Sequence, residues 1–203
     1  MDTVIELLAV IASATYGSLR ARRQHMDFVG VFSLAFIVAF GGGTLRDLFL
    51  DQHPLFWMRE HHYPVIVFFL ALVMSFLKEL PDKFERYLNI PDALGLGLFS
   101  IVGANVALDA GVSLFNASLL GVGTGAFGGV RGDIVCNQVP SIFRPAPLFA
   151  TCSFVGCWVF FGLRSHSATL PYAAPLAVLA IVVMRLLAIW YRLHLPHTAE
   201  PPD

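Results

Sequence analysis

Residues 41–47 read GGGTLRD and directly follow the apolar run FSLAFIVAF at 32–40. Three glycines, which weaken a helix, and an Arg–Asp pair stand where an apolar helix would simply continue. A related stretch, GAFGGVRGD, occupies residues 125–133, so that Asp133 follows Asp47 by 86 positions. Because charged side chains inside an apolar segment are costly, both stretches indicate positions with a specific role.

The composition around the two stretches is that of a membrane protein. Of the 203 residues, 57% are hydrophobic and 13% are charged, whereas soluble domains carry about 25% charged residues. A helix of about 20 mostly apolar residues spans a bilayer. Seven such segments predict an all-α integral membrane protein, at residues 3–19, 28–50, 62–80, 91–109, 113–138, 146–163 and 172–192. The net charge of −1 gives no reason to expect a nucleic-acid partner.

The basic residues between the segments predict how the chain is oriented. Loops on one side of the membrane hold eight of them, Arg20, Arg22, Arg23, Lys78, Lys83, Arg86, Arg144 and Arg192, and those on the other side hold only Arg59 and Arg164. Because cytoplasmic loops are enriched in Lys and Arg, the N-terminus is expected outside and the C-terminus in the cytoplasm. Residues 194–203 are expected to form a disordered cytoplasmic tail.

A shift of 86 residues also aligns the two halves of the chain. GGTLRDLFLDQHPLF (42–56) lies over GGVRGDIVCNQVPSI (128–142), and the predicted spans fall into register. The expected organisation is a first three-helix repeat (1–86), a second (87–165), a seventh helix (166–193) and the tail. With an odd number of spans in each repeat, the second copy enters the membrane from the opposite side. Such inverted repeats are typical of transport proteins, whose substrate sites lie near the midplane.

The glycines predict that the second and fifth spans break or kink at Gly41–Gly43 and around Gly123–Gly129. A break would expose carbonyls and amide N–H groups to an ion or substrate at mid-membrane. It would also place Asp47 and Asp133 in the first turns of the second half-helices, beside Arg46 and Arg131. The alternative is that the glycines only permit close helix packing.

Two GGG-x-x-R-D-like motifs in a seven-span chain of this length resemble the prokaryotic TRIC (trimeric intracellular cation) channels, a family also labelled glycine-transporter-domain membrane proteins. The resemblance covers roughly residues 3–193. It implies a homotrimer in the bacterial cytoplasmic (inner) membrane, in contact with lipids, whose protomers each hold an hourglass pore lined by the kinked second and fifth helices. It implies passage of monovalent cations, mainly K⁺, with no cofactor.

Carried over by position, the resemblance predicts pore residues in both copies, namely Gly41, Gly42, Gly43, Thr44, Arg46, Asp47, Gly128, Gly129, Arg131 and Asp133. The second copy departs from the pattern because Gly132, rather than an arginine, directly precedes Asp133. Two interpretations of a pore arginine stay open. Paired with an aspartate it would orient the carboxylate, whereas unpaired it would oppose cations or favour anions.

Three further sets of residues complete the hypotheses. Tyr16 and Asn105 either line the cavity or form interhelical hydrogen bonds. Arg185, in the last span, is expected to reach the membrane interface. A zinc site at His53, His61 and His62 is not favoured, because their spacing matches no known ligand set. No nucleophile–base pattern or phosphate-binding loop points to an enzyme. The alternatives to a cation channel are a secondary transporter of a small zwitterion such as glycine, and a scaffold that conducts nothing.

Overall fold

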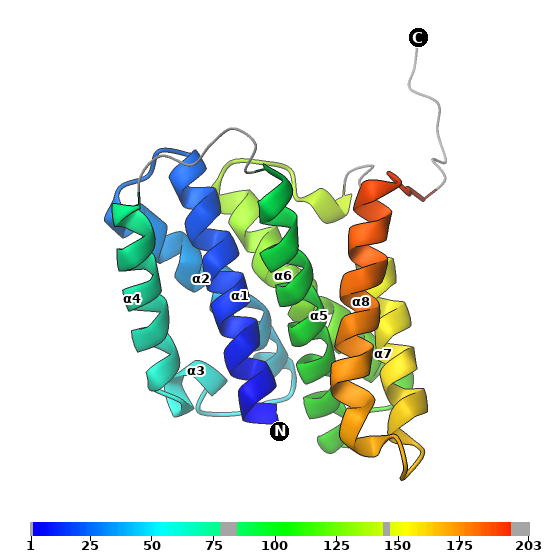
Figure 1. Ribbon diagram of the computed structural model, residues 1–203. Helices are drawn as coiled ribbons and strands as arrows, with labels where there is room; N and C mark the ends of the chain where they lie inside the picture. The colour runs from blue at the N-terminus through cyan, green and yellow to red at the C-terminus, as the bar shows by residue number, and fades with distance from the viewer. Residues whose placement is uncertain (1, 78–84, 144–146, 196–203) are drawn as a thin grey trace.

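The computed structural model describes residues 2–77, 85–143 and 147–195, and these residues form helices joined by loops (Figure 1). The helices are α1 (Asp2–Arg23), α2 (Phe28–Phe49), α3 (Phe56–Arg59), α4 (His62–Phe76), α5 (Glu85–Asp109), α6 (Leu114–Val135), α7 (Ala150–Arg164) and α8 (Ala173–Trp190). Two 3₁₀ turns, η2 (Ser141–Phe143) and η3 (Leu170–Tyr172), lie in loops. Seven long helices thus occupy the seven predicted spans, and α3 is an extra turn. Most of the predicted tail, 196–203, lies outside the described residues.

The lengths of the helices fit a membrane environment. Four described segments are long and apolar enough to cross a bilayer by length and composition: Thr3–Arg23, Phe28–Phe49, Leu88–Asp109 and Leu170–Trp190. The apolar helices α4 and α7 have 15 residues each, or about 22 Å, which is shorter than a bilayer core of about 30 Å. α6 lies among these helices although glycines, Arg131 and Asp133 lower its hydropathy.

The helices form two units that are packed in the same way. In the first, α1 packs against α2 and α4, and α2 also contacts α4; in the second, α5 packs against α6 and α7, and α6 also contacts α7. The units join through α1 against α5 and α2 against α6, while α8 packs on α5 and α7. α1 and α5 run in opposite directions along the bundle (Figure 1). The predicted antiparallel pairing of two three-helix repeats plus one helix is therefore seen in the fold.

The ends of α2 and α6 repeat at the same interval of 86 residues. The N-cap side chain of Asp27 accepts a hydrogen bond from the amide of Gly30 at 2.9 Å, and that of Ser113 accepts one from Asn116 at 3.5 Å. Beyond their C-termini, Asp51 and Asn137 adopt left-handed φ angles of 51° and 52°. Asn and Asp tolerate this conformation better than most residues, so both copies can end their helices with the same turn.

These N-caps allow a direct comparison between the copies. We expect Asp27→Ala to lower the free energy of unfolding by about 1 kcal/mol, because the first turn of α2 loses its acceptor and a favourable charge. Ser113→Ala should cost less, because its hydrogen bond is longer. Thermal unfolding in detergent, followed by tryptophan fluorescence, measures both changes. An equal or larger loss for Ser113→Ala would contradict the expectation.

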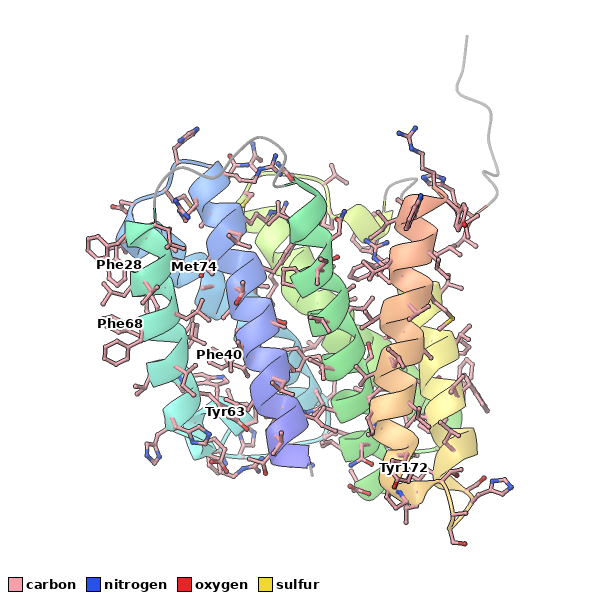
Figure 2. The ribbon with its side chains drawn as sticks, viewed as in Figure 1. Phe28, Phe40, Tyr63, Phe68, Met74 and Tyr172 are labelled. Atoms are coloured by element: carbon pink, nitrogen blue, oxygen red, sulfur yellow. The ribbon has the colours of Figure 1, made fainter. Side chains whose placement is uncertain are left out.

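Aromatic side chains of the first unit lie both in its interior and at its outer edge (Figure 2). Phe40 and Tyr63 are buried, at 2% and 0% exposure. Phe28 and Phe68 lie at the outer edge, where their ring centroids are 5.6 Å apart. Large apolar side chains remain exposed on most of the long helices. A soluble domain seldom exposes so much apolar surface, so the bundle is suited to contact with lipid.

Candidate functional site

The glycine motif of α2 does not interrupt the helix. α2 is one continuous α-helix from Phe28 to Phe49, and α6 is likewise continuous from Leu114 to Val135. Of the predicted break or kink, the break is therefore wrong, and the kink stays a prediction. A glycine costs about 0.5–1 kcal/mol in a helix relative to alanine, whereas an unsatisfied backbone group in hydrocarbon costs several kcal/mol. Keeping the backbone hydrogen bonds is therefore the less costly arrangement.

Instead, the glycines let α2 and α6 cross at backbone contact. A Cβ atom on Gly42 would overlap the carbonyl oxygen of Thr124, and a Cβ on Gly128 would overlap that of Val38. These contacts are related by the offset of 86, since Val38 corresponds to Thr124 and Gly42 to Gly128. Such reciprocal pairing is the signature of a two-fold interface. The packing alternative for the glycines is thus supported at the centre of the molecule.

Because both helices are continuous, the two aspartates lie in a different part of the helix from the one predicted. Asp47 lies in the last turn of α2 and Asp133 in the last turn of α6, not in the first turn of a second half-helix. Each follows the crossing glycine by five residues, so each lies about 7.5 Å from the crossing along its own helix, one on either side. A helix C-terminus disfavours an anion, and each carboxylate therefore requires other groups to compensate its charge.

On the α2 side, one guanidinium is shared by two carboxylates. Arg46 Nε donates to Asp47 Oδ1 at 2.8 Å, and Arg46 Nη1 donates to Glu6 Oε1 of α1 at 3.3 Å. The side chains of Arg46 and Asp47 are only 1% and 2% exposed. We refer to Glu6, Arg46 and Asp47 as the α2 cluster. Its arginine is paired, which favours the interpretation that it orients a carboxylate.

The loop after α2 closes over this cluster. The amide of Phe56 donates to Asp47 Oδ2 at 2.7 Å, and the Phe56 ring lies 5.2 Å from the Arg46 guanidinium carbon. The same ring fills the space beside Gly43, where a Cβ would lie less than 3 Å from it. Thr44 accepts a hydrogen bond at 3.1 Å from the indole of Trp57. Asp47 therefore fixes the loop as well as the arginine.

On the α6 side, the guanidinium comes from another helix. Arg20, in the last turn of α1, forms an ion pair with Asp133. Its Nη1 also donates to the hydroxyl of Tyr16 at 3.1 Å, and its Nη2 donates to Gln138 Oε1 at 2.7 Å. The ion pair is largely buried, since the side chains of Arg20 and Asp133 are 14% and 7% exposed. This contact joins the first repeat to the second.

A second ion pair completes the α6 side. Arg185 of α8 lies 3.6 Å from Asp92 of α5, and its Nη1 donates to the carbonyls of Pro147 and Leu148 at 2.8 and 3.1 Å. These partners hold Arg185 buried at 7% exposure, so its guanidinium binds loop carbonyls of the protein instead of extending into water. Asp92 lines the same small cavity as Tyr16, the residue to which Arg20 donates a hydrogen bond. We refer to the group that shares these contacts as the α6 cluster, consisting of Tyr16, Arg20, Asp92, Asp133 and Arg185.

Arg131 does not take the role of Arg46. Its guanidinium carbon lies 4.9 Å from the centre of the Phe127 ring, and its side chain packs against Gly41 of α2. Within the described part of the chain, no carboxylate pairs with it. The predicted Arg131–Asp133 pair is thus not formed, because one residue of offset turns the arginine by about 100° around the helix.

Cavities flank the crossing on both sides. One of about 310 Å³ lies beside the α2 cluster and is lined by Leu45, Arg46, Phe49, Asn116, Leu119, Leu120, Gly123 and Thr124. A smaller cavity of about 10 Å³ lies beside the α6 cluster, where Tyr16, Asp92, Gly128 and Gly129 contribute to its wall. Thr124 lines both cavities. The smaller one is at the lower limit of the volume that can hold one water molecule.

Comparison with known sequences agrees with the two-fold construction. Residues 3–79 and 89–165 each match the same family model, which is described as "Glycine transporter". The chain is also 30% identical over 194 residues to the UPF0126 inner membrane protein YadS of Escherichia coli K12, covering 95% of this chain and 93% of that protein. The chain therefore belongs to the family described as "Glycine transporter".

The chain is also similar to solved structures of TRIC channels. A crystal structure of the TRIC trimeric intracellular cation channel orthologue from Rhodobacter sphaeroides is 30% identical, with a TM-score of 0.88 over 95% of this chain and 98% of that one. A second TRIC cation channel structure is 27% identical, with a TM-score of 0.86 over 99% and 98%. The predicted resemblance to the prokaryotic TRIC family is confirmed.

The two further residues predicted from the sequence fall at different places. Tyr16 lies in the α6 cluster and lines the small cavity there. Asn105 lines a separate cavity of about 230 Å³, where it accepts a hydrogen bond from Arg164 and donates to Asp109 at 3.2 Å. Within the described ranges, no group of three or more His, Cys, Asp or Glu residues is arranged to bind a metal ion.

Sequence reasoning missed four members of the site: Glu6, Arg20, Asp92 and Thr124. Glu6 and Asp92 were detectable, because they are 86 residues apart, as Asp47 and Asp133 are. Arg20 was counted only as a loop charge, and its offset partner is Val106, so the repeat gives no signal for it. The family pattern likewise gives no signal for Thr124, whose part in the crossing depends on how α2 and α6 pack.

Proposed function

We propose that the protein is a homotrimeric channel for monovalent cations, with K⁺ preferred and one pathway in each protomer. The observation that carries the proposal is the pair of carboxylate clusters on either side of the Gly42–Gly128 crossing. The likeness to TRIC cation channels at 30% identity supports it. The proposed pathway residues are Gly41, Gly42, Gly43, Thr44, Arg46, Asp47, Gly128, Gly129, Arg131 and Asp133, to which Glu6 and Asp92 are added.

The α2 cluster is suited to attract cations. Glu6 and Asp47 share the single guanidinium of Arg46, so the cluster carries a negative formal charge when both carboxylates are ionised. Arg59 also acts on Glu6, but it is exposed and therefore better screened. Rings of carboxylates select cations in channels. Arg46 holds Asp47 in place without reversing the sign of the local field.

Conduction requires α2 and α6 to separate. Backbone contact at Gly42 and Gly128 divides the two cavities at Thr124. We propose that both helices bend at their glycine motifs, Gly41–Gly43 and Gly123–Gly129, when the pathway opens, because glycines lower the cost of local helix distortion. The two cavities would then join into an hourglass.

The proposed location is the inner membrane, as named for the relative YadS. α1 begins at one end of the bundle and α8 ends at the other (Figure 1). The excess of Lys and Arg in the loops at the end where α8 finishes supports a cytoplasmic C-terminus and an outside N-terminus. Neither this topology nor the two clusters requires an enzymatic reaction.

The second candidate is a secondary transporter of a small zwitterion such as glycine. The description of the matching family favours it, and adjacent guanidinium and carboxylate groups are suited to the two charges of an amino acid. The α2 and α6 clusters would then bind substrate in turn as the repeats rock against each other.

Recordings from purified protein in a planar bilayer separate the two candidates. Under a KCl gradient we expect discrete ohmic openings that reverse near the K⁺ equilibrium potential, because the carboxylates favour cations. Native mass spectrometry should show a trimer. Saturable glycine uptake by proteoliposomes in the absence of openings would support the transporter instead, and a dimer would contradict the proposed assembly.

A further inference from the structure

The cavity that contains Asn105 lies apart from the crossing of α2 and α6. It has a volume of about 230 Å³ and shares no lining residue with the two cavities beside the α2 and α6 clusters. We refer to it as the α8 cavity, because it lies where α8 begins, the end of that helix marked by Tyr172 in Figure 2. Its walls are formed by Ile5, Ile101, Val102, Asn105, Asp109, Phe160, Arg164, Leu170, Ala173 and Ala174.

Three of the lining side chains are polar and form one network. Arg164 of α7 donates hydrogen bonds to Asn105 and, at 2.9 Å, to Asp109, both on α5. Asn105 Nδ2 in turn donates to Asp109 Oδ2 at 3.2 Å. The side chains of Arg164 and Asp109 are 35% and 55% exposed, and an ion pair that water reaches contributes little to stability. A ligand can therefore separate the two charges at low cost and pair with both.

The apolar walls of the α8 cavity lie mostly inside the bundle. Ile101, Phe160 and Ala173 are only 1%, 4% and 1% exposed. These walls are therefore suited to a short apolar group, whereas the acyl chains of a lipid would require an exposed groove. The volume is also below the roughly 300–1,000 Å³ of pockets for drug-sized ligands. The cavity thus fits a small molecule that combines an apolar part with charged groups.

The polar residues of the cavity are not required by the two-fold construction. At the offset of 86, Asn105 and Asp109 correspond to Leu19 and Arg23, so the first repeat has neither the amide nor the carboxylate at the equivalent positions. α8, which completes the cavity, belongs to neither repeat. The packing that the two repeats share therefore does not account for this set of residues.

We propose that the α8 cavity binds an α-amino acid with an aliphatic side chain of about the size of leucine. Its carboxylate pairs with the Arg164 guanidinium, which can donate two parallel hydrogen bonds to it, and the first turn of α8, beginning at Ala173, also favours an anion. Its ammonium pairs with Asp109, and its side chain packs against Ile101 and Phe160. A zwitterion keeps the cavity balanced in charge, whereas a simple anion or cation would leave one of the two partners without a counter-charge.

The test measures saturable binding of tritiated L-leucine to the purified protein in phosphatidylcholine nanodiscs. We expect one leucine bound per protomer. Glycine should compete at least about tenfold more weakly than leucine, because it leaves the apolar wall uncovered. Leucinamide, which lacks the carboxylate, and 4-methylpentanoate, which lacks the ammonium, should show a similar loss. These compounds are compared on the wild type, so the result does not depend on the folding of any variant.

Three variants locate the bound leucine. Asp109→Asn removes the partner of the ammonium and Ala174→Leu fills the cavity, so each should weaken leucine binding by about tenfold or more. Asp51→Asn is the matched control, because it removes a carboxylate that is 98% exposed and lies outside the cavity. Native mass spectrometry before each binding measurement establishes that the variant assembles as the wild type does.

Each outcome supports or overturns the proposal. Wild type that binds no leucine saturably would overturn it, and so would equal competition by glycine and leucine. Leucine binding that survives in both Asp109→Asn and Ala174→Leu would place the amino acid outside this cavity. Thermal stabilisation by phosphatidylethanolamine that Asp109→Asn abolishes, in protein that binds no leucine, would assign the cavity to a lipid headgroup instead. None of these measurements uses a K⁺ current, so the proposed channel function is tested separately.

Discussion

Replacing Asp47 by alanine is expected to abolish the K⁺ current and to lower the free energy of unfolding by about 3–5 kcal/mol. The carboxylate compensates the buried Arg46 guanidinium and also accepts the amide of Phe56 at 2.7 Å. Alanine would leave the guanidinium with only Glu6, at 3.3 Å, and would leave the amide without its acceptor. Both losses occur where little water can replace the missing partner.

Two further variants divide this effect into its parts. Asp47→Asn keeps an oxygen for the Phe56 amide but removes the charge, so it should recover part of the stability and little of the current. Asp51→Asn is the matched control, because the Asp51 side chain is 98% exposed and asparagine already occupies the equivalent position 137 at nearly the same φ.

The measurements are thermal unfolding in detergent and K⁺ flux into proteoliposomes. Wild-type flux in Asp47→Ala would remove this carboxylate from the pathway. A large loss of stability in Asp51→Asn would show that the assay responds to any lost charge near the end of α2, rather than to the buried pair.

Replacing Gly42 by alanine should be the next most damaging substitution. The added methyl group would overlap the Thr124 carbonyl oxygen, a backbone atom that cannot rotate away. Overpacking of this kind costs about 1–3 kcal/mol, and more where the backbone must shift. Gly128→Ala should act in the same direction, because its methyl group would meet the carbonyl of Val38.

Gly123 provides the control for this prediction. It lies on α6 one residue before Thr124, and no atom lies within 4 Å of the position its Cβ would take. Gly123→Ala should therefore stabilise the protein by about 0.5–1 kcal/mol through helix propensity alone. If Gly42→Ala and Gly123→Ala unfolded at the same temperature, the glycines would serve helix flexibility and not close approach.

Much of the architecture could be predicted because it depends on properties of segments. Apolar length gave the seven long helices, and the offset of 86 gave the two units. The offset extends further than was predicted, to the N-caps Asp27 and Ser113 and to the left-handed residues Asp51 and Asn137. The alignment of 42–56 with 128–142 was therefore a sample of a longer correspondence.

Contacts between helices could not be predicted in the same way. Glycine propensity alone favoured a broken α2, but the Thr124 carbonyl against Gly42 gives the glycine a different use. Arg20 was counted as a charge of a cytoplasmic loop, and Arg185 was expected to reach the membrane interface because charged side chains usually reach water. Their actual partners, Asp133 and Asp92, lie on helices distant in sequence, and no local pattern indicates such pairs.

The buried charges of the two clusters find their partners at different stages of the synthesis of the chain. Every partner in the α2 cluster lies between Glu6 and Tyr63, so its buried charges can be compensated once the first repeat has entered the membrane. The α6 cluster draws on Arg20 near the beginning and on Arg185 near the end. A nascent chain released before α8 is made would hold Asp92 without its guanidinium. Full electrostatic balance is therefore reached only at the end of translation, which makes a truncated product distinguishable from a finished one.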